Sequence, residues 1–230
     1  DYMLPTQARS IQMEIVSASG ETMRSFESTE PGMTTEAGQE MRGPFQRSTG
    51  AAAPTLKQGL NRFVWNFTVP GPGGSGRGPL VVPGRYTARL TVDGQTSERS
   101  FEVIMDPRVA ADGVTQADLQ AQYDLGIQVR TAIEDADATI ERLQGAQVRA
   151  AEGSDVADDL KEIERALLTD RTITSYPEPM LRDQFNYLYG NTQRADQKPA
   201  ADMYERLEIL VTELEEHKQR LQQLIRMVTQ

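Results

Sequence analysis

The sequence contains no cysteine and a single histidine among its 230 residues. The first absence excludes disulfides, thiol nucleophiles and cysteine-bound zinc, and the second excludes any metal site that needs two imidazoles. Basic residues are also outnumbered, with 24 Lys+Arg against 34 Asp+Glu and a net charge of −10. Because this charge opposes contact with phosphate backbones and anionic headgroups, we expect no nucleic-acid partner and peripheral membrane contact only through other proteins.

Long apolar runs are missing as well. No stretch approaches the about 18 consecutive apolar residues of a membrane-spanning helix. The chain opens at Asp1 without a charged-then-apolar leader, which indicates a processed or trimmed chain with no transmembrane segment. Its 38% hydrophobic content is nevertheless sufficient for a buried core, so we expect it to fold.

Charge and glycine divide the chain into two parts. Residues 1–105 carry ten acidic and ten basic groups, whereas residues 106–230 carry 24 acidic and 14 basic groups. Most of the glycine lies in the first part, and after Asp106 the apolar period changes from 2 to about 3.5 residues. We therefore predict a strand domain over residues 1–108 and an acidic helical domain over residues 109–230.

Alternating apolar and polar residues predict strands in the first domain. Residues 86–92 and 101–105 alternate on either side of Asp93-Gly94, a pair that suits the positive φ of a hairpin turn. Residues 11–16 and 22–26 predict a second hairpin. A further strand is expected to place three aromatic residues on one face, namely Phe63, Trp65 and Phe67. Five or six short strands favour a small antiparallel sandwich.

Two segments lack this periodicity and are expected to be long loops, at residues 27–58 and 70–80. The first is longer than most loops of compact domains, and we expect it to be mobile or draped over the sandwich. The second contains G-x-G-x-x-G from Gly71 to Gly76, which in a dinucleotide site opens a helix. Here it runs into a strand-and-turn pattern, so a flexible connection is favoured over a phosphate cradle.

The second domain carries helical periodicity. The first helix has an apolar stripe at Leu119, Tyr123, Ile127, Ile133, Ala136, Ile140 and Leu143. Ser154 is expected to begin a shorter helix, with apolar positions at Val156, Leu160, Ile163 and Leu167. A break at Pro177-Glu178-Pro179 precedes a third helical stretch, which we expect Gly190 to end.

The last helix shows the clearest pattern. Its apolar positions alternate steps of four and three residues, at Met203, Leu207, Leu210, Leu214, His217, Leu221, Leu224 and Val228. Such a heptad seam must lie along a neighbouring helix. An antiparallel three-helix-type bundle would bury it, and so would a dimer.

Candidate reactive groups are few. His217 follows Glu213 by one helical turn, but di-iron bundles need a Glu-x-x-His from each of two helices. The neighbouring acids Asp158-Asp159 and Glu215-Glu216 point apart on a helix and have Lys or Arg within one turn. We interpret the histidine as a packing residue and the acids as salt-bridging helix faces. We expect no catalytic residue, no metal and no cofactor.

Aromatic residues give a second kind of candidate. Trp65 with Phe63 and Phe67 would suit a sugar-stacking platform, although three alternating aromatics on a strand more often form core. Asn66 begins an N-glycosylation pattern, which we discount because it falls inside an expected strand. The candidate contact residues for a ligand or partner are Trp65, Arg77 and Tyr86.

Several stretches resemble a known family, at residues 59–66, 82–90 and 101–108. The chain resembles the C-terminal region of bacterial exported proteins that carry BNR or sortilin-type propeller repeats and are often labelled glycosyl hydrolases. Its first half is similar to the immunoglobulin-like domain of flagellar hook-capping proteins, in which a Gly, a Trp and a Pro-Gly-x-Tyr recur in this order. Asn66 departs from that pattern, in which Asp usually follows the Trp.

The resemblance implies an exported α+β protein, in which an immunoglobulin-like antiparallel β-sandwich is followed by an α-helical bundle. In that family the propeller precedes this region and would hold any catalytic site, so no active-site residue is carried over. We expect a non-enzymatic protein-protein interaction or structural module, and specifically an accessory periplasmic subunit of a larger envelope or membrane-associated complex, for example an electron-transfer or photosynthetic assembly. The alternatives are an accessory C-terminal domain of a glycosidase-like propeller enzyme and a carbohydrate-binding sandwich.

Overall fold

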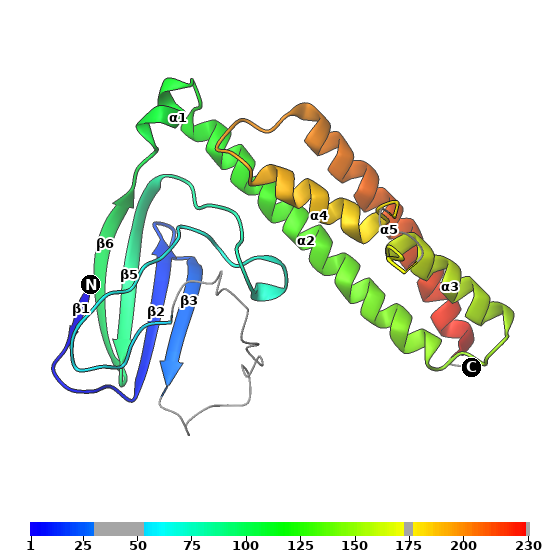
Figure 1. Ribbon diagram of the computed structural model, residues 1–230, viewed down its shortest axis with the longest axis horizontal. Helices are drawn as coiled ribbons and strands as arrows, with labels where there is room; N and C mark the ends of the chain where they lie inside the picture. The colour runs from blue at the N-terminus through cyan, green and yellow to red at the C-terminus, as the bar shows by residue number, and fades with distance from the viewer. Residues whose placement is uncertain (30–52, 173–176, 229–230) are drawn as a thin grey trace. The chain divides into compact units, whose positions relative to one another are not determined.

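The computed structural model describes residues 1–29, 53–172 and 177–228. Within them the chain is an α+β protein with antiparallel sheets of two and four strands and with four helices of twelve residues or more (Figure 1). It forms two compact units, Asp1–Gln116 (the strand unit) and Ala117–Gln230 (the helical unit). The α+β prediction is confirmed. The short helix α1 (Pro107–Ala111) belongs to the strand unit, and most of the expected loop at residues 27–58 lies outside the described residues.

Both predicted hairpins are present in the four-stranded sheet. β2 (Ser10–Ser17) pairs with β3 (Thr22–Thr29), and β5 (Gly84–Val92) pairs with β6 (Gln95–Val103), in the order β3-β2-β5-β6. The turn residues Asp93 and Gly94 have φ of 46° and 84°. Positive φ at both central positions matches the twist of the flanking strands, which explains why the Asp-Gly pair marks this hairpin in the sequence.

The sheet has one apolar and one polar face. Met13 lies opposite Leu90 on β5 and Phe26 on β3, so these side chains share the apolar face. On the other face Arg89 pairs with Glu98 at 2.7 Å and with Glu14 at 3.5 Å. The apolar face must therefore be covered by another part of the chain.

Part of that cover follows the short strand β4 (Gly59–Asn61), which pairs with β1 (Tyr2–Leu4). The ring of Phe63 lies 4.8 Å from that of Phe26, and Trp65 lies 6.1 Å from Tyr86. The predicted strand through Phe63, Trp65 and Phe67 is wrong. Phe67 has a φ of 59° and the Trp65 indole N–H donates to the Thr68 carbonyl over 3.0 Å, so the backbone turns where an extended strand was expected.

The glycine-rich loop is closed by backbone hydrogen bonds. The Gly78 N–H donates to Val69 O over 2.9 Å, and the Val69 N–H donates to Pro79 O over 3.0 Å. Between them Pro72–Gly74 form the single 3-10 turn η1. The G-x-G-x-x-G motif is followed by extended chain and a β-bridge at Leu80, as the sequence pattern indicates.

Polar contacts between the helices show in which directions they run in the helical unit. α2 (Gln116–Gln147) runs antiparallel to α3 (Asp155–Leu167) and α4 (Leu181–Thr192), and parallel to α5 (Ala201–Val228). The antiparallel contacts are Gln147 with Glu164 and Arg182 with Asp137. The parallel contacts are Gln122 with Gln197 and Asp135 with Lys218.

The buried residues of the helical unit can be compared with the predicted apolar stripes. The α5 seam is confirmed, since its leucines at 207, 210, 214, 221 and 224 are buried in one cluster. The stripe of α2 is correct from Ile133 onward, but Leu125 and Val129 fill the core where Tyr123 and Ile127 were expected. Ser154 caps α3 by accepting from the Ala157 N–H, as predicted, whereas α4 continues two residues beyond Gly190.

Candidate functional site

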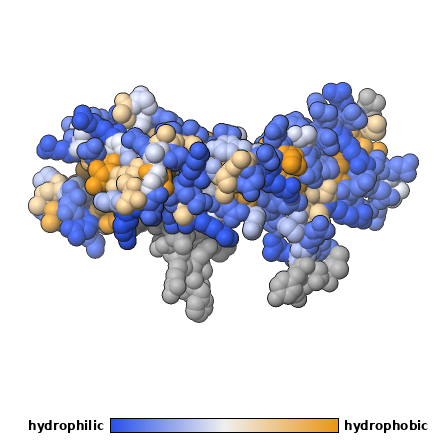
Figure 2. Space-filling view, turned by 90° about the horizontal axis from the view of Figure 1, so that it is seen from above, coloured by the Kyte–Doolittle hydropathy of each residue, from blue (hydrophilic) through white to orange (hydrophobic). Residues whose placement is uncertain are grey.

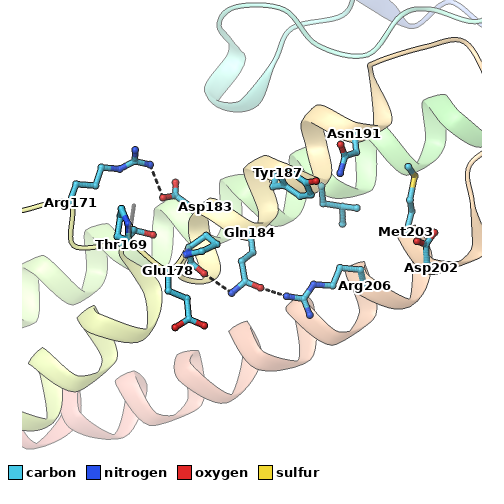
Figure 3. A pocket seen from close by; sticks show the side chains of 13 residues that line it. Thr169, Arg171, Glu178, Asp183, Gln184, Tyr187, Asn191, Asp202, Met203 and Arg206 are labelled. Carbon is cyan, nitrogen blue, oxygen red and sulfur yellow. Dashed lines mark hydrogen bonds and ion pairs between the residues drawn. The ribbon is translucent and has the colours of Figure 1, made fainter. Parts of the chain in front are cut away.

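A groove between the segment that follows α3, helix α4 and the first turns of α5 is a concave surface of the helical unit (Figure 3). Pro177, Glu178 and Pro179, which lead into α4, lie along one rim. Its apolar floor includes Leu188 and Met203, and polar side chains from α4 and α5 form the walls. α4 begins at Leu181, shortly after Pro179, and its Asp183, Gln184 and Tyr187 line the groove.

The first wall is held by an ion pair. Arg171 Nη2 lies 2.8 Å from Asp183 Oδ2, and the Thr169 hydroxyl also bonds to Asp183. Partial burial opposes ionisation of Asp183, but the Thr169 hydroxyl and the Arg171 guanidinium outweigh it and lower the pKa of this carboxyl. The same hydroxyl accepts the Met180 N–H over 2.9 Å, so Thr169 satisfies the first turn of α4 as well.

The second wall joins α4 to α5. Gln184 donates to the Pro179 carbonyl over 2.8 Å and accepts a hydrogen bond from the Arg206 guanidinium. Beside it Tyr187 projects from α4 with 67% of its surface exposed. The view in Figure 3 places Tyr187 between Gln184 and Asn191 along the groove.

The groove presents several kinds of polar side chain. Its lining contains hydroxyls, amides, guanidinia and carboxylates but no imidazole, and its Thr169 hydroxyl is already bonded on both sides. Across the described residues no group of three or more His, Asp or Glu is placed to hold a metal ion. What this surface offers is an apolar floor with fixed polar walls and an exposed phenol, which suits binding of a peptide segment.

The aromatic candidates lie in the core of the strand unit. Trp65 and Tyr86 are only 9% and 7% exposed, and the Trp65 ring is also in edge contact with Phe67 and Phe101. The Tyr86 hydroxyl donates to the Val82 carbonyl over 2.6 Å, and burial raises its pKa. The structure brings these two candidates together and leaves Arg77 apart from them, exposed on the glycine-rich loop.

The acid pairs of the helices form ion pairs. Asp158 pairs with Lys161 and Glu215 with Lys218, each one helical turn away, as predicted. The sequence pattern did not reveal that Asp159 also reaches Arg220 of α5, at 2.7 Å. His217 is half-buried on α5 and does not line the groove.

The strand unit has a separate apolar surface. Met3 and Leu60 are cross-strand partners on the outer side of the β1–β4 pair and are 66% and 71% exposed. Figure 2 shows hydrophobic residues gathered on the exposed surface of the strand unit. Neither this surface nor the groove was predicted, because each depends on which apolar residues the tertiary structure leaves uncovered.

Comparison with known proteins gives no relative. No protein-family model, no curated protein and no solved structure matches the chain. No helix in the described ranges has the length and apolar content needed to cross a bilayer. The resemblance to exported propeller proteins therefore stays a prediction.

Proposed function

We propose that the chain is a non-enzymatic interaction or structural module, which serves as an accessory subunit of a larger extracytoplasmic, envelope-associated or membrane-associated complex. The observation that carries this proposal is the α3–α4–α5 groove. Its polar walls are held by Asp183–Arg171 and Gln184–Arg206 contacts, so they are set before anything binds. Exposed Tyr187, together with Met203 and two arginines, gives it the residue types that are enriched at protein interfaces.

The proposal includes a finer architecture. Helices α2 and α5 run parallel with α3 and α4 antiparallel to both, which supports a three-helix-type bundle whose middle element is broken at the prolines. An antiparallel sheet with one covered apolar face supports an immunoglobulin-like sandwich. Export to the periplasm belongs to the same proposal and is supported by the family resemblance at residues 59–66, 82–90 and 101–108.

Native purification tests the function. The chain, tagged in its source organism, is isolated under mild conditions, and its partners are mapped by crosslinking and mass spectrometry. We expect a defined complex with crosslinks at the α3–α4–α5 groove and weaker recovery with Tyr187→Ala. A matched control is Met227→Ala, which removes an equally exposed side chain near the end of α5. A chain that is always recovered alone would contradict the proposal, and a longer intact product carrying a propeller would favour the accessory-domain alternative.

A further inference from the structure

A second groove of the helical unit lies on the opposite side of α5, between α5 and α2. Its lining comes from Ile127, Gln128 and Thr131 of α2 and from Tyr204, Leu207, Glu208 and Val211 of α5. Leu207 is buried at its base, and Tyr204 and Val211 are exposed along it. Ile127 belongs to the stripe that the sequence assigned to the core, so the groove explains where that apolar side chain lies.

Polar bridges lie beyond each end of this groove and join α2 to α5 or to the segment just before α5. At one end the Gln197 N–H donates to Gln122 Oε1 over 3.1 Å. At the other end Lys218 Nζ lies 2.7 Å from Asp135, and the hydrogen bonds that it donates to Asp135 and Glu215 raise the pKa of this lysine. The lining itself runs over residues 127–131 of α2 and 204–211 of α5, which is about 10 Å along α5 at about 1.5 Å per residue.

The exposed charges beside the groove that form no ion pair among the described residues are acidic. Helical spacing continues its walls as two rows, Asp124, Gln128, Thr131 and Asp135 on α2 and Glu205, Glu208, Thr212 and Glu215 on α5. Asp124, Glu205 and Glu208 are exposed and make no ion pair with any other described residue. An apolar floor between acidic rows is complementary to a helix with apolar residues on one face and Lys or Arg beside them.

We propose that the α2–α5 groove binds a basic amphipathic helix of a partner protein, over about two helical turns. This inference rests on the proposed function, since it names the chemistry of one partner segment. A second copy of this chain is a poor occupant, because residues 106–230 hold 24 acidic against 14 basic groups and two copies would repel each other. The apolar floor supplies the affinity, and the acidic rows select the charge of the occupant.

Peptide binding to the full chain tests the proposal. The probe is a lactam-bridged helical peptide of about 14 residues, with leucines at i, i+3, i+4 and i+7 and lysines on both flanks. A matched peptide has glutamate at every lysine position. We expect the lysine peptide to bind at least about tenfold more tightly by fluorescence anisotropy, with backbone NMR shifts at Ile127, Tyr204 and Val211.

Two variants separate charge from apolar contact. The double variant Glu205→Lys/Glu208→Lys should weaken the lysine peptide about tenfold and improve binding of the glutamate peptide, whereas Val211→Lys should weaken both. Asp155→Lys/Asp158→Lys, on exposed positions of α3, reverses the same number of charges away from the groove and should change neither. Circular dichroism and thermal unfolding establish that each variant is folded.

Several outcomes would overturn the proposal. In the peptide experiment, these are equal affinity for the two peptides or NMR shifts at the α3–α4–α5 groove. A salt-sensitive dimer that Val211→Lys abolishes would mean that a second copy occupies the groove, and crosslinks from residues 1–116 of the same chain would mean that its strand unit does. Native purification of the double variant distinguishes failure of this inference from failure of the proposed function. If Glu205→Lys/Glu208→Lys leaves that complex intact, the groove assignment fails and the interaction function stands.

Discussion

Arg24 on β3 donates to the carbonyl oxygen of Gly76, 3.0 Å away and 52 residues further along the chain. The same guanidinium donates to Thr68 Oγ1 at 3.0 Å and to Val69 O at 3.1 Å, and it lies over the Phe26 ring. Desolvation by burial lowers the pKa of Arg24. A single side chain therefore ties the glycine-rich loop to the edge of the four-stranded sheet.

Replacing Arg24 should loosen this loop. Arg24→Met keeps the apolar stem but removes the guanidinium that donates to the Gly76 carbonyl and to Thr68 Oγ1. We expect a loss of about 1–3 kcal/mol in the free energy of unfolding. Arg24→Lys should recover little of the stability that Arg24→Met loses, because an ammonium cannot reproduce the planar fork of the guanidinium. Urea unfolding followed by Trp65, the sole tryptophan, measures the loss. Arg62→Met removes a largely exposed ion pair with Asp1 as the control, and an equal loss there would refute this role.

Gly78 should tolerate no side chain. A Cβ at this position would lie 2.5 Å from Val69 O and closer still to Pro70 O. Gly78→Ala therefore forces residues 69–70 and residue 78, on the two sides of the loop, apart. We expect a destabilisation of about 1–3 kcal/mol, read from the same unfolding curve. Gly84→Ala is the matched control, because its Cβ would meet nothing nearer than 4.0 Å. Equal stability of the two variants would contradict the loop geometry.

Two aromatic residues of α4 should differ sharply. Phe185 is fully buried in the helical core, whereas Tyr187 faces solvent two residues later. Phe185→Ala should therefore cost about 3–5 kcal/mol in the unfolding free energy of the helical unit, followed by far-ultraviolet circular dichroism. Tyr187→Ala should change it by no more than about 0.5 kcal/mol. A large loss in the second variant would mean that Tyr187 is a packing residue and unsuitable as a test of binding.

Asp106 gives the strand unit a pH dependence. Its carboxylate accepts the Arg108 guanidinium and N–H at the start of α1, and these bonds lower its pKa from 3.8 to about 2. A carboxyl with a lowered folded-state pKa stabilises the fold above its unfolded pKa, and this contribution is lost as the pH falls from 3.8 through about 2. Asp106→Asn should remove this part of the acid sensitivity while keeping the cap acceptor.

Carboxyl NMR titration checks that prediction directly. We expect a midpoint near 2 for Asp106 in the parent chain, and a return toward 3.8 in Arg108→Ala, where the first cause of the shift is gone. If the titration midpoint of Asp106 is the same in Arg108→Ala as in the parent chain, the hydrogen bonds from Arg108 do not cause the lowered pKa.

The sequence by itself determined what depends on neighbouring residues. The β5–β6 hairpin follows from the Asp93-Gly94 turn and the alternation around it, and the α5 seam follows from the spacing of its leucines. These patterns are local, because turn dihedrals and helical periodicity are fixed within a few residues.

Only the tertiary structure decided the features that join distant parts of each unit. Phe67 takes a positive φ because Trp65 and Thr68 close a turn there, and Arg24 finds its loop acceptors only after β3 has been placed at the sheet edge. The two grooves of the helical unit arise in the same way, since Ile127 and Tyr187 carry no local mark of being uncovered. Whether a side chain is core or surface depends on the helices that pack beside it, and long-range packing leaves no period in the chain.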